Sequence, residues 1–308
     1  MRHYHESGKC CGANSHREAL NFDKLPASIL IIGAGAIGVE FATIFGYCGV
    51  KVTLVEMLPS ILPEIRDEKI IHTIQESLKS QGITVLVGNK VDNITITQKE
   101  VITSLSGGEQ FLTDKVLVAC GRVPNSDGFE SLGLKMDGHR IIVDKHMRTN
   151  IPHIYASGDV TGPPLLAHKA SKEGVIAAEN ASGLESRMDY NSIPNCIFSY
   201  PEIACVGKFE SELDESMVGE YQFGGTGKAL CIGEPKGFVK VVANKEGKVK
   251  GVQIIGPHAV DLIGIGVIGV KKGLSANELG ELIYPHPTLS ECLKEAFLDV
   301  GDRAIHKI

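Results

Sequence analysis

Apolar residues along the first quarter of the chain follow a strand period, then a helix period, then a strand period again. Ser28–Ile32 is almost wholly apolar, as in a strand covered on both faces. After it, apolar residues recur at steps of three and four up to Cys48, and Gly49 is placed to end that helix. An extended pattern resumes over residues 52–55. This order predicts the opening unit of a doubly wound α/β domain.

The same alternation continues to about residue 119. Ile70, Ile74 and Leu78 share one helical face, and residues 83–87 and 116–119 have the composition of buried strands. Between those strands, a hairpin turn is predicted where two glycines follow each other, at Gly107-Gly108. The class expected for this region is therefore α/β with a doubly wound sheet.

The pattern of apolar and polar residues changes from about residue 191 onward. Residues 238–243 and 248–255 form the pattern of a β-hairpin across 244–247, and Ser275 with Glu278 makes a capping box that opens a helix. Residues 262–270 are rich in glycine and apolar side chains, a surface that can pack closely against a partner. These features predict a second domain of α+β type.

Composition and charge narrow the classes of partner. Apolar residues make up 43% of the chain and charged ones 22%, values of an ordinary globular protein. The net charge of -6 comes without blocks of like charge, which disfavours nucleic acid and anionic membranes as partners.

Residues 1–9 are polar and lack a secretory signal, so a cytosolic location is expected. The apolar run 27–52 carries Glu40 and five glycines, so a buried strand, turn and helix explain it better than a membrane span.

Cysteine and histidine positions give little sign of a metal site. The 8 cysteines show no repeated spacing of the kind that zinc sites or disulfide frameworks use. A loose amino-terminal group has the composition of a metal-binding tail, but its irregular spacing favours a foreign or unstructured tail; its members are His3, His5, Cys10, Cys11 and His16. No metal is expected.

The glycine-rich turn after the first strand carries the clearest chemistry. In Gly33-Ala-Gly35-Ala-Ile-Gly38 the first glycine permits a tight turn, the second admits a pyrophosphate, and the third allows the helix to pack closely. Glu56 closes the next strand, where an acid would hydrogen-bond the adenosine ribose and repel the extra phosphate of NADP. The spacing predicts a dinucleotide site that prefers NAD.

Four motifs downstream of this site appear in a recognisable order. They are Cys120-Gly121-Arg122-Val-Pro124-Asn125, the run from Thr149 to Asp159, Leu166-Ala-His168-Lys-Ala170, and His286-Pro-Thr-Leu-Ser-Glu291. With the nucleotide site, the series resembles the pyridine nucleotide-disulfide oxidoreductases, and among them the dihydrolipoamide dehydrogenases. Singly, each motif has a plain structural explanation, whereas their order makes the resemblance specific.

The resemblance implies FAD as a second cofactor and assigns most of the remaining contacts. It implies that Asp159 holds the ribityl and phosphate part of FAD. The other cofactor positions that it implies are Leu166, Ala167 and His168 beside the flavin, and Ile37, Glu40, Val91 and Gly121 at the NAD site.

The His286 motif has chemistry that can be argued from the residues. Pro287 suits the first position of a helix, which predicts a helix from there with Glu291 just over a turn along. A carboxylate so placed can hold one ring nitrogen while the other takes a proton. In the family, such a pair is the acid-base dyad that acts on the flavin and disulfide of the partner subunit. The usual motif has a further histidine where this chain has Tyr284.

The resemblance also divides the chain. Residues 1–20 are expected to be a tail and lead-in, 21–145 an NAD-binding domain, 146–190 part of an FAD-binding domain, and 191–308 the domain that makes a homodimer. Lipoyl-bearing components of 2-oxo acid dehydrogenase complexes are the partners implied.

Two hypotheses about function stay open at this point. A family member carries a flavin-binding GxGxxG and a CxxxxC redox disulfide ahead of the NAD domain, and neither is found there; no two cysteines in this sequence are five positions apart. The first hypothesis is a truncated dihydrolipoyl dehydrogenase that passes electrons between a dithiol and NAD through FAD. The alternative is a non-catalytic NAD(H)-binding dimerisation module derived from that family.

Overall fold

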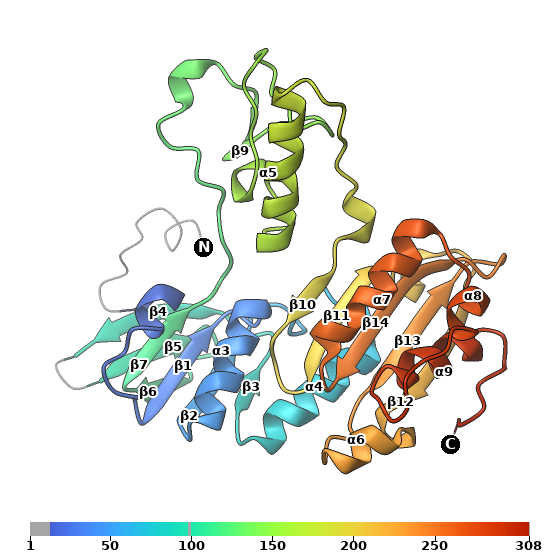
Figure 1. Cartoon of the computed structure of the whole chain (residues 1–308). Coiled ribbons are helices and arrows are strands. Elements are labelled where there is room, and N and C mark those ends of the chain that lie inside the picture. The colour runs from blue at the N-terminus through green and yellow to red at the C-terminus, as the bar shows by residue number, and fades with distance from the viewer. Residues whose placement is uncertain (1–12, 98–99, 308) are drawn as a thin grey trace. The chain divides into compact units, whose positions relative to one another are not determined.

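The computed structural model describes residues 13–97 and 100–307, which divide into two compact units (Figure 1). Unit 1 comprises residues Met1–Gly121 and Cys196–Ile308, and unit 2 comprises Arg122–Asn195. The predicted domain limits at residues 145 and 190 both lie within unit 2, and the predicted division into domains stays a prediction. Of the amino-terminal histidines and cysteines, only His16 lies within the described residues.

A parallel four-stranded sheet forms the first half of unit 1. Its order is β3-β2-β1-β7, and its strands are β1 Ser28–Ile32, β2 Lys51–Val55, β3 Thr84–Leu86 and β7 Lys115–Val118. The register pairs Ile32 with both Val55 and Val118, so the carboxyl ends of the central strands meet at one edge. This sheet confirms the predicted doubly wound α/β class and brings the glycine loop close to Glu56.

The helices of this half begin and end where local chemistry dictates. α3 covers Ala36–Tyr47, and α4 covers Glu68–Ser80 with Ile70, Ile74 and Leu78 buried as predicted. Gly49 and Gly82 follow them in the left-handed region, each with φ of +78°, which only glycine adopts at little cost. The remaining elements here are α2 His16–Ala19, β4 Val91–Ile96, β5 Val101–Leu105 and β6 Gln110–Thr113.

An antiparallel five-stranded sheet forms the second half of unit 1, in the order β10-β11-β14-β13-β12. The predicted hairpin is confirmed as β13 paired with β14. The strands are β10 Asn195–Ile197, β11 Glu202–Gly207, β12 Met217–Gln222, β13 Phe238–Ala243 and β14 Val249–Gly256. The helices are α6 Gly227–Cys231, α7 Ala259–Lys272, α8 Ala276–Gly280 and α9 Glu291–Asp299, with short 3-10 turns at Glu210–Glu212 and Phe223–Gly225.

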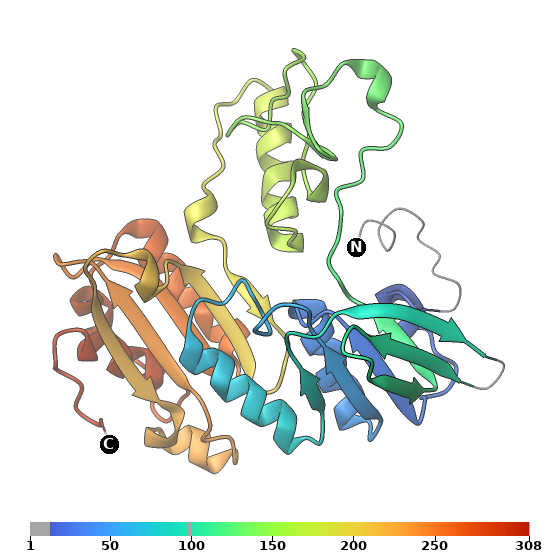
Figure 2. The same cartoon turned by 180° about the vertical axis from the view of Figure 1, so that it is seen from behind.

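The two faces of this sheet belong to different cores. Alternate residues such as Ala204 and Val206 face α7, α8 and α9. Ile203 and Cys205 face the other way and join the core that contains Ile70 of α4. Figure 2 shows α4 alongside this sheet. Period-two alternation along β11 therefore ties the first half of unit 1 to its second half.

Two helices of the second half of unit 1 can be compared with the sequence expectations. The capping box of Ser275 and Glu278 opens α8, as predicted. The glycine-rich residues 262–270 lie inside α7, where Gly266 packs on Val252 of β14; the packing of this stretch against a partner stays a prediction. Among the helices described, none is long and apolar enough to cross a bilayer.

Unit 2 is small and organised around one long helix, α5, which covers Ala167–Ala181. Its apolar core contains the buried residues Met147, Ile176 and Met188. A two-stranded sheet of β8 Met136–Asp137 and β9 Arg140–Ile141 and three 3-10 turns, Glu130–Leu132, Asp159–Thr161 (η2) and Tyr190–Ser192, complete it.

Candidate functional site

Each glycine of the loop between β1 and α3 has a separate structural reason. Gly33 has φ of +98°, and a Cβ there would lie 2.6 Å from the carbonyl oxygen of Ala119. A Cβ on Gly38 would lie 1.8 Å from the carbonyl oxygen of Gly33. A Cβ on Gly35 would meet no described atom within 4 Å. The first and third positions therefore need glycine for packing, and the second leaves open space at the main chain.

The amino terminus of α3 is suited to an anion. Gly35 is the N-cap residue, no side chain among the described residues caps the helix, and no acid lies in its first turn. The helix dipole and the amino-terminal N–H groups therefore face the open side of Gly35. Ile37 lies in this first turn. The arrangement fits the pyrophosphate of a dinucleotide.

Glu56 follows the last residue of β2 and is turned toward the glycine loop. Its carboxylate accepts hydrogen bonds from the main-chain N–H of Ala34 at 2.7 Å and of Leu58 at 2.9 Å. Each carboxylate oxygen keeps a second acceptor position, so both can still receive a ribose hydroxyl. The sequence predicted the ribose contact but not the main-chain hydrogen bonds, by which Glu56 also fixes the loop.

The other predicted NAD-site residues occupy three different elements. Glu40 lies in α3, and its Oε1 accepts from the N–H of Phe198 at 3.0 Å. Burial raises the pKa of the Glu40 carboxyl, and the hydrogen bond from Phe198 partly offsets that rise. Gly121 follows β7 with φ of +103°, two residues beyond the contact of Ala119 with the loop. Val91 is the first residue of β4 and packs against the apolar cluster of the sheet. Their roles stay predictions.

In unit 2, the predicted flavin residues cluster around the start of α5. Leu166 is the N-cap of α5 and Ala167 its first residue, so their main chain is at a helix amino terminus. His168 Nε2 lies 2.8 Å from the carbonyl oxygen of Pro194. Asp159, in η2, forms an ion pair with Arg122 at 3.0 Å, which sequence reasoning did not foresee.

A buried ion pair that the sequence did not reveal holds the Asp159 loop. Lys169 and Glu173 have side chains 1% and 0% exposed and lie 3.1 Å apart, one helical turn from each other on α5. Lys169 Nζ also donates to the carbonyl oxygens of Gly158 at 3.1 Å and Gly162 at 2.9 Å. Glu173 accepts from the N–H of Gly158 at 2.8 Å. The pair thus holds both ends of the loop that contains Asp159 through hydrogen bonds to its main chain. Its only signal in the sequence is the i,i+4 spacing, which is common on exposed helices.

The predicted histidine-glutamate contact is present. His286 Nδ1 lies 2.8 Å from Glu291 Oε1, and Glu291 Oε2 accepts from the N–H of Thr288 at 2.8 Å. Burial raises the pKa of the Glu291 carboxyl, but the hydrogen bonds from Thr288 and His286 outweigh burial and hold that pKa below its usual value. The imidazole is 78% exposed, so its second nitrogen is open to solvent. The carboxylate can orient the ring while Nε2 exchanges a proton.

The expected helix start at Pro287 was wrong. α9 begins at Glu291, and the residues before it form a turn in which Thr288 Oγ1 donates to the carbonyl oxygen of Pro285. Glu291 completes that turn by accepting the N–H of Thr288, so it lies in the first turn of the helix rather than a turn inside it. The predicted contact between His286 and Glu291 forms even without that helix start, because the turn brings the two side chains together.

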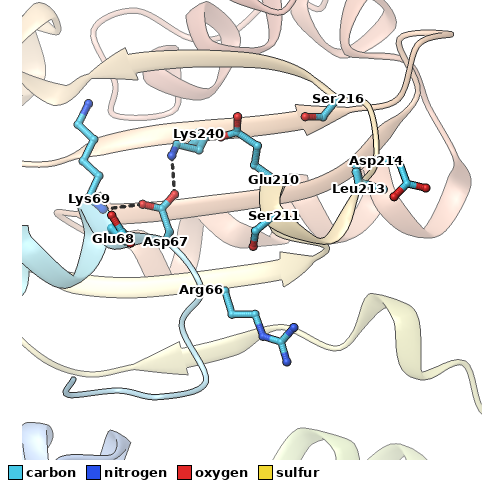
Figure 3. A pocket seen from close by; sticks show the side chains of 10 residues that line it. All are labelled: Arg66, Asp67, Glu68, Lys69, Glu210, Ser211, Leu213, Asp214, Ser216 and Lys240. Atoms are coloured by element: carbon cyan, nitrogen blue, oxygen red, sulfur yellow. Dashed lines mark hydrogen bonds and ion pairs between the residues drawn. The ribbon is translucent and has the colours of Figure 1, made fainter. Parts of the chain in front are cut away.

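A separate hollow of about 550 Å³ lies in unit 1 at the start of α4 (Figure 3). Its wall holds the ion pair of Asp67 and Lys240, with charges of both signs around it, including Arg66, Glu210 and Asp214. None of the predicted cofactor or dyad residues lines it. Because the charges alternate in sign and Asp67 already caps α4, the hollow favours neither an anion nor a cation. Within residues 13–97 and 100–307, no three acidic, histidine or cysteine side chains gather as a metal site requires.

Comparison with known families matches most of the chain. Residues 7–174 match the pyridine nucleotide-disulphide oxidoreductase family, and residues 193–297 match the dimerisation domain of the same family. The chain therefore belongs to the pyridine nucleotide-disulphide oxidoreductase family, as the order of motifs predicted.

Individual relatives support the narrower resemblance to dihydrolipoyl dehydrogenases. The chain is 38% identical over 299 residues to a dihydrolipoyl dehydrogenase of Bacillus subtilis, covering 94% of this chain and 65% of that protein. It is 38% identical to a dihydrolipoyl dehydrogenase of Halobacterium salinarum, with 95% and 64% covered. The chain thus spans slightly less than two thirds of the length of these relatives.

Solved structures share the fold. LpdA of Mycobacterium tuberculosis superposes with a TM-score of 0.87 at 28% identity, covering 92% of this chain and 63% of that one. The HOCl-induced flavoprotein disulfide reductase RclA of Escherichia coli superposes with a TM-score of 0.85 at 26% identity, with 93% and 68% covered.

Proposed function

We propose that this chain supplies the NAD site and the acid-base dyad of a dihydrolipoyl dehydrogenase-type reaction. The observation that carries the proposal is the contact of His286 with Glu291 in the region that matches the dimerisation domain. The open glycine loop beside Glu56 supports NAD as the nicotinamide cofactor. Homodimer formation through residues 191–308, service to lipoyl-bearing components and a cytosolic location belong to the same proposal.

The dyad is suited to remove a proton from a thiol. Glu291 fixes the ring through Nδ1 and stabilises the imidazolium that forms when Nε2 accepts the proton. In the net reaction a dithiol loses two electrons and two protons and becomes a disulfide, while NAD takes up a hydride and one proton is released. FAD, when bound, would carry the electron pair between the sulfur and nicotinamide centres.

In this proposal, Asp159 and the main chain at Leu166 and Ala167 hold FAD, and Lys169 with Glu173 keeps the Asp159 loop in place. The redox cysteine pair is not contained in these 308 residues. A second candidate function is a non-catalytic NAD(H)-binding dimerisation module, and the test below separates the two.

The test is complementation across a dimer. The 308-residue chain is co-expressed with a full-length relative whose dyad histidine is substituted, and the purified mixed dimer is assayed for NAD-linked oxidation of dihydrolipoamide. Activity is expected to return with this chain and to be lost again with His286→Ala. The matched control is His72→Gln, which changes an exposed histidine on α4 and is expected to preserve activity.

Two results would overturn parts of the proposal. A mixed dimer that forms but stays inactive would favour the non-catalytic module. Failure of the two chains to form a mixed dimer, although each is folded, would contradict the assignment of residues 191–308 as a family-type interface.

A further inference from the structure

α9 carries two carboxylates that each face an imidazole. Glu291 and Glu295 are four positions apart, so they lie on one face of the helix with Cβ atoms about 6 Å apart. Glu291 is paired with His286 at 2.8 Å, and Glu295 is paired with His306 at 3.0 Å, in each case through Nδ1. No local pattern predicts the second pair, because His306 lies beyond the end of α9, outside any helical spacing from Glu295.

The second pair is built into the fold. Glu295 is 3% exposed and also accepts from the main-chain N–H of Ile305 at 2.7 Å and of His306 at 3.1 Å. Tyr221 of β12 donates its hydroxyl to the carbonyl oxygen of His306 at 2.9 Å. The ring of His306 itself is 68% exposed. A buried carboxylate is thus joined to an imidazole that exchanges protons with solvent.

Both carboxylates are held in their ionised form. Burial raises the pKa of Glu295, but hydrogen bonds from the side chain and main chain of His306 and from Ile305 outweigh it and lower that pKa. For Glu291, the charge of His306 adds to the hydrogen bonds from Thr288 and His286 that lower its pKa. The two pairs are therefore close enough to interact electrically.

The remaining groups around these carboxylates do not supply a competing charge near neutral pH. Burial first, and then Glu295, raises the pKa of Tyr221 to about 12. Burial likewise raises the pKa of Cys292 to about 12, and its Sγ lies 2.7 Å from the hydroxyl of Thr226. Asp299, further along α9, is neutralised by Lys307 at 2.7 Å. His286 and His306 are the two imidazoles in direct contact with these carboxylates.

We infer that Glu295 and His306 are positioning residues for the dyad, forming an outlying imidazole-carboxylate pair whose proton occupancy is coupled to that of the His286–Glu291 pair. The role of this pair in catalysis rests on the proposed function, whereas the electrostatic coupling between the two pairs does not.

The coupling follows from the signs of the charges. When His306 is protonated, it balances Glu295 and favours the negative charge of Glu291. When His306 loses its proton, Glu295 becomes an unbalanced anion one helical turn from Glu291. That extra negative charge favours a proton on His286. A proton on one imidazole therefore disfavours a proton on the other, and the two pairs titrate as a coupled system.

The test measures Glu291 directly in the 308-residue chain, with carboxyl-labelled glutamate followed by NMR across pH. In His306→Gln the titration midpoint of Glu291 is expected to rise by about 0.5, because a nearby positive charge is gone. In Glu295→Gln it is expected to fall, because a nearby negative charge is gone. The double variant is expected to differ from the sum of the two. His72→Gln is the matched control.

Unchanged Glu291 midpoints in both folded variants would overturn the coupling, whatever happens in the complementation assay. If His306→Gln unfolds α9, the His306→Asn variant is measured in its place, and an unchanged Glu291 midpoint would again overturn the coupling. Shifted midpoints with no complementation would leave the coupling standing and reject the proposed function instead.

Discussion

Asp67 Oδ2 lies 2.5 Å from Nζ of Lys240, an ion pair that joins the start of α4 to β13 with both side chains largely buried. The second oxygen of Asp67 caps α4 by accepting from the main-chain N–H of Lys69 at 3.0 Å and of Ile70 at 3.1 Å. One carboxylate therefore caps a helix in the first half of unit 1 and anchors a strand in its second half.

Asp67→Ala is expected to lower the free energy of unfolding by about 4 kcal/mol, because it removes a helix cap and leaves a buried ammonium without its anion. Lys240→Met is expected to cost about 1 kcal/mol less than Asp67→Ala, because the carboxylate that loses its counter-charge still caps α4. Urea unfolding measures both. Lys245→Met, in an exposed pair with Glu215, is the control and should change stability by less than about 0.5 kcal/mol. Equal losses at Asp67 and Lys240 would contradict the double role of Asp67.

The glycine loop offers a matched pair of substitutions that separate packing from ligand access. Gly38→Ala places a Cβ against the carbonyl oxygen of Gly33 and is expected to cost about 3 kcal/mol of stability. Gly35→Ala meets no described atom and is expected to cost less than about 1 kcal/mol. Gly35→Ala should nevertheless weaken NADH binding at least about tenfold, because its methyl group occupies the open side of the loop.

Thermal unfolding and calorimetric titration with NADH check the two substitutions together. A Gly35→Ala chain that binds NADH as tightly as the unsubstituted chain would show that the pyrophosphate does not lie at this loop.

Glu56 is expected to set the preference for NADH over NADPH. The chain should bind NADH at least about tenfold more tightly, and Glu56→Gln should reduce that ratio to about threefold or less, because the neutral amide no longer repels a 2′-phosphate. Glutamine is chosen over alanine because its oxygen can still accept the N–H of Ala34. Fluorescence titration with both nucleotides provides the ratio, with Glu76→Gln on the exposed face of α4 as control. Equal affinities in the unsubstituted chain would refute the assignment.

Local rules predicted much of this fold because the relevant contacts are close in sequence. Gly49 and Gly82 end helices through backbone freedom that glycine alone supplies, and Ser275 with Glu278 caps α8 through bonds three residues apart. The positive φ of Gly33 and the close approach of Gly38 to it also follow from local geometry. For the same reason, the family resemblance could be stated from motif order.

The features that sequence reasoning missed depend on contacts that no local pattern specifies. His306 reaches Glu295 only because residues 305–307 fold back on α9. Pro287 fits a helix start, yet Thr288 finds its acceptor in Glu291 and a turn forms instead. Lys169 and Glu173 have the spacing of an ordinary surface pair, and their burial depends on a loop and on Tyr190 closing over them.

Substitutions at Lys169 and Glu173 test whether the stability of unit 2 depends on the balance of these two buried charges rather than on the packing of the side chains. Lys169→Met leaves a buried carboxylate whose counter-charge is gone, and Glu173→Gln leaves a buried ammonium in the same position. Each is expected to cost about 3 to 5 kcal/mol. The double substitution removes both charges and should cost clearly less than the sum. Lys172→Met, exposed on the same helix, is the control and should change little.

The local effect of the pair can be followed at Tyr190, whose hydroxyl donates to Glu173 at 2.6 Å. Burial is the largest cause that raises the pKa of Tyr190, and the charge and hydrogen bond of Glu173 raise it further. Glu173→Gln should therefore lower the pKa of Tyr190 while burial keeps it above the usual value, as NMR of the labelled phenol ring can measure. The amide of Gly158, which donates to Glu173, should also exchange faster with solvent. If neither the Tyr190 titration nor the Gly158 exchange changes in a folded variant, the pair does not hold the Asp159 loop.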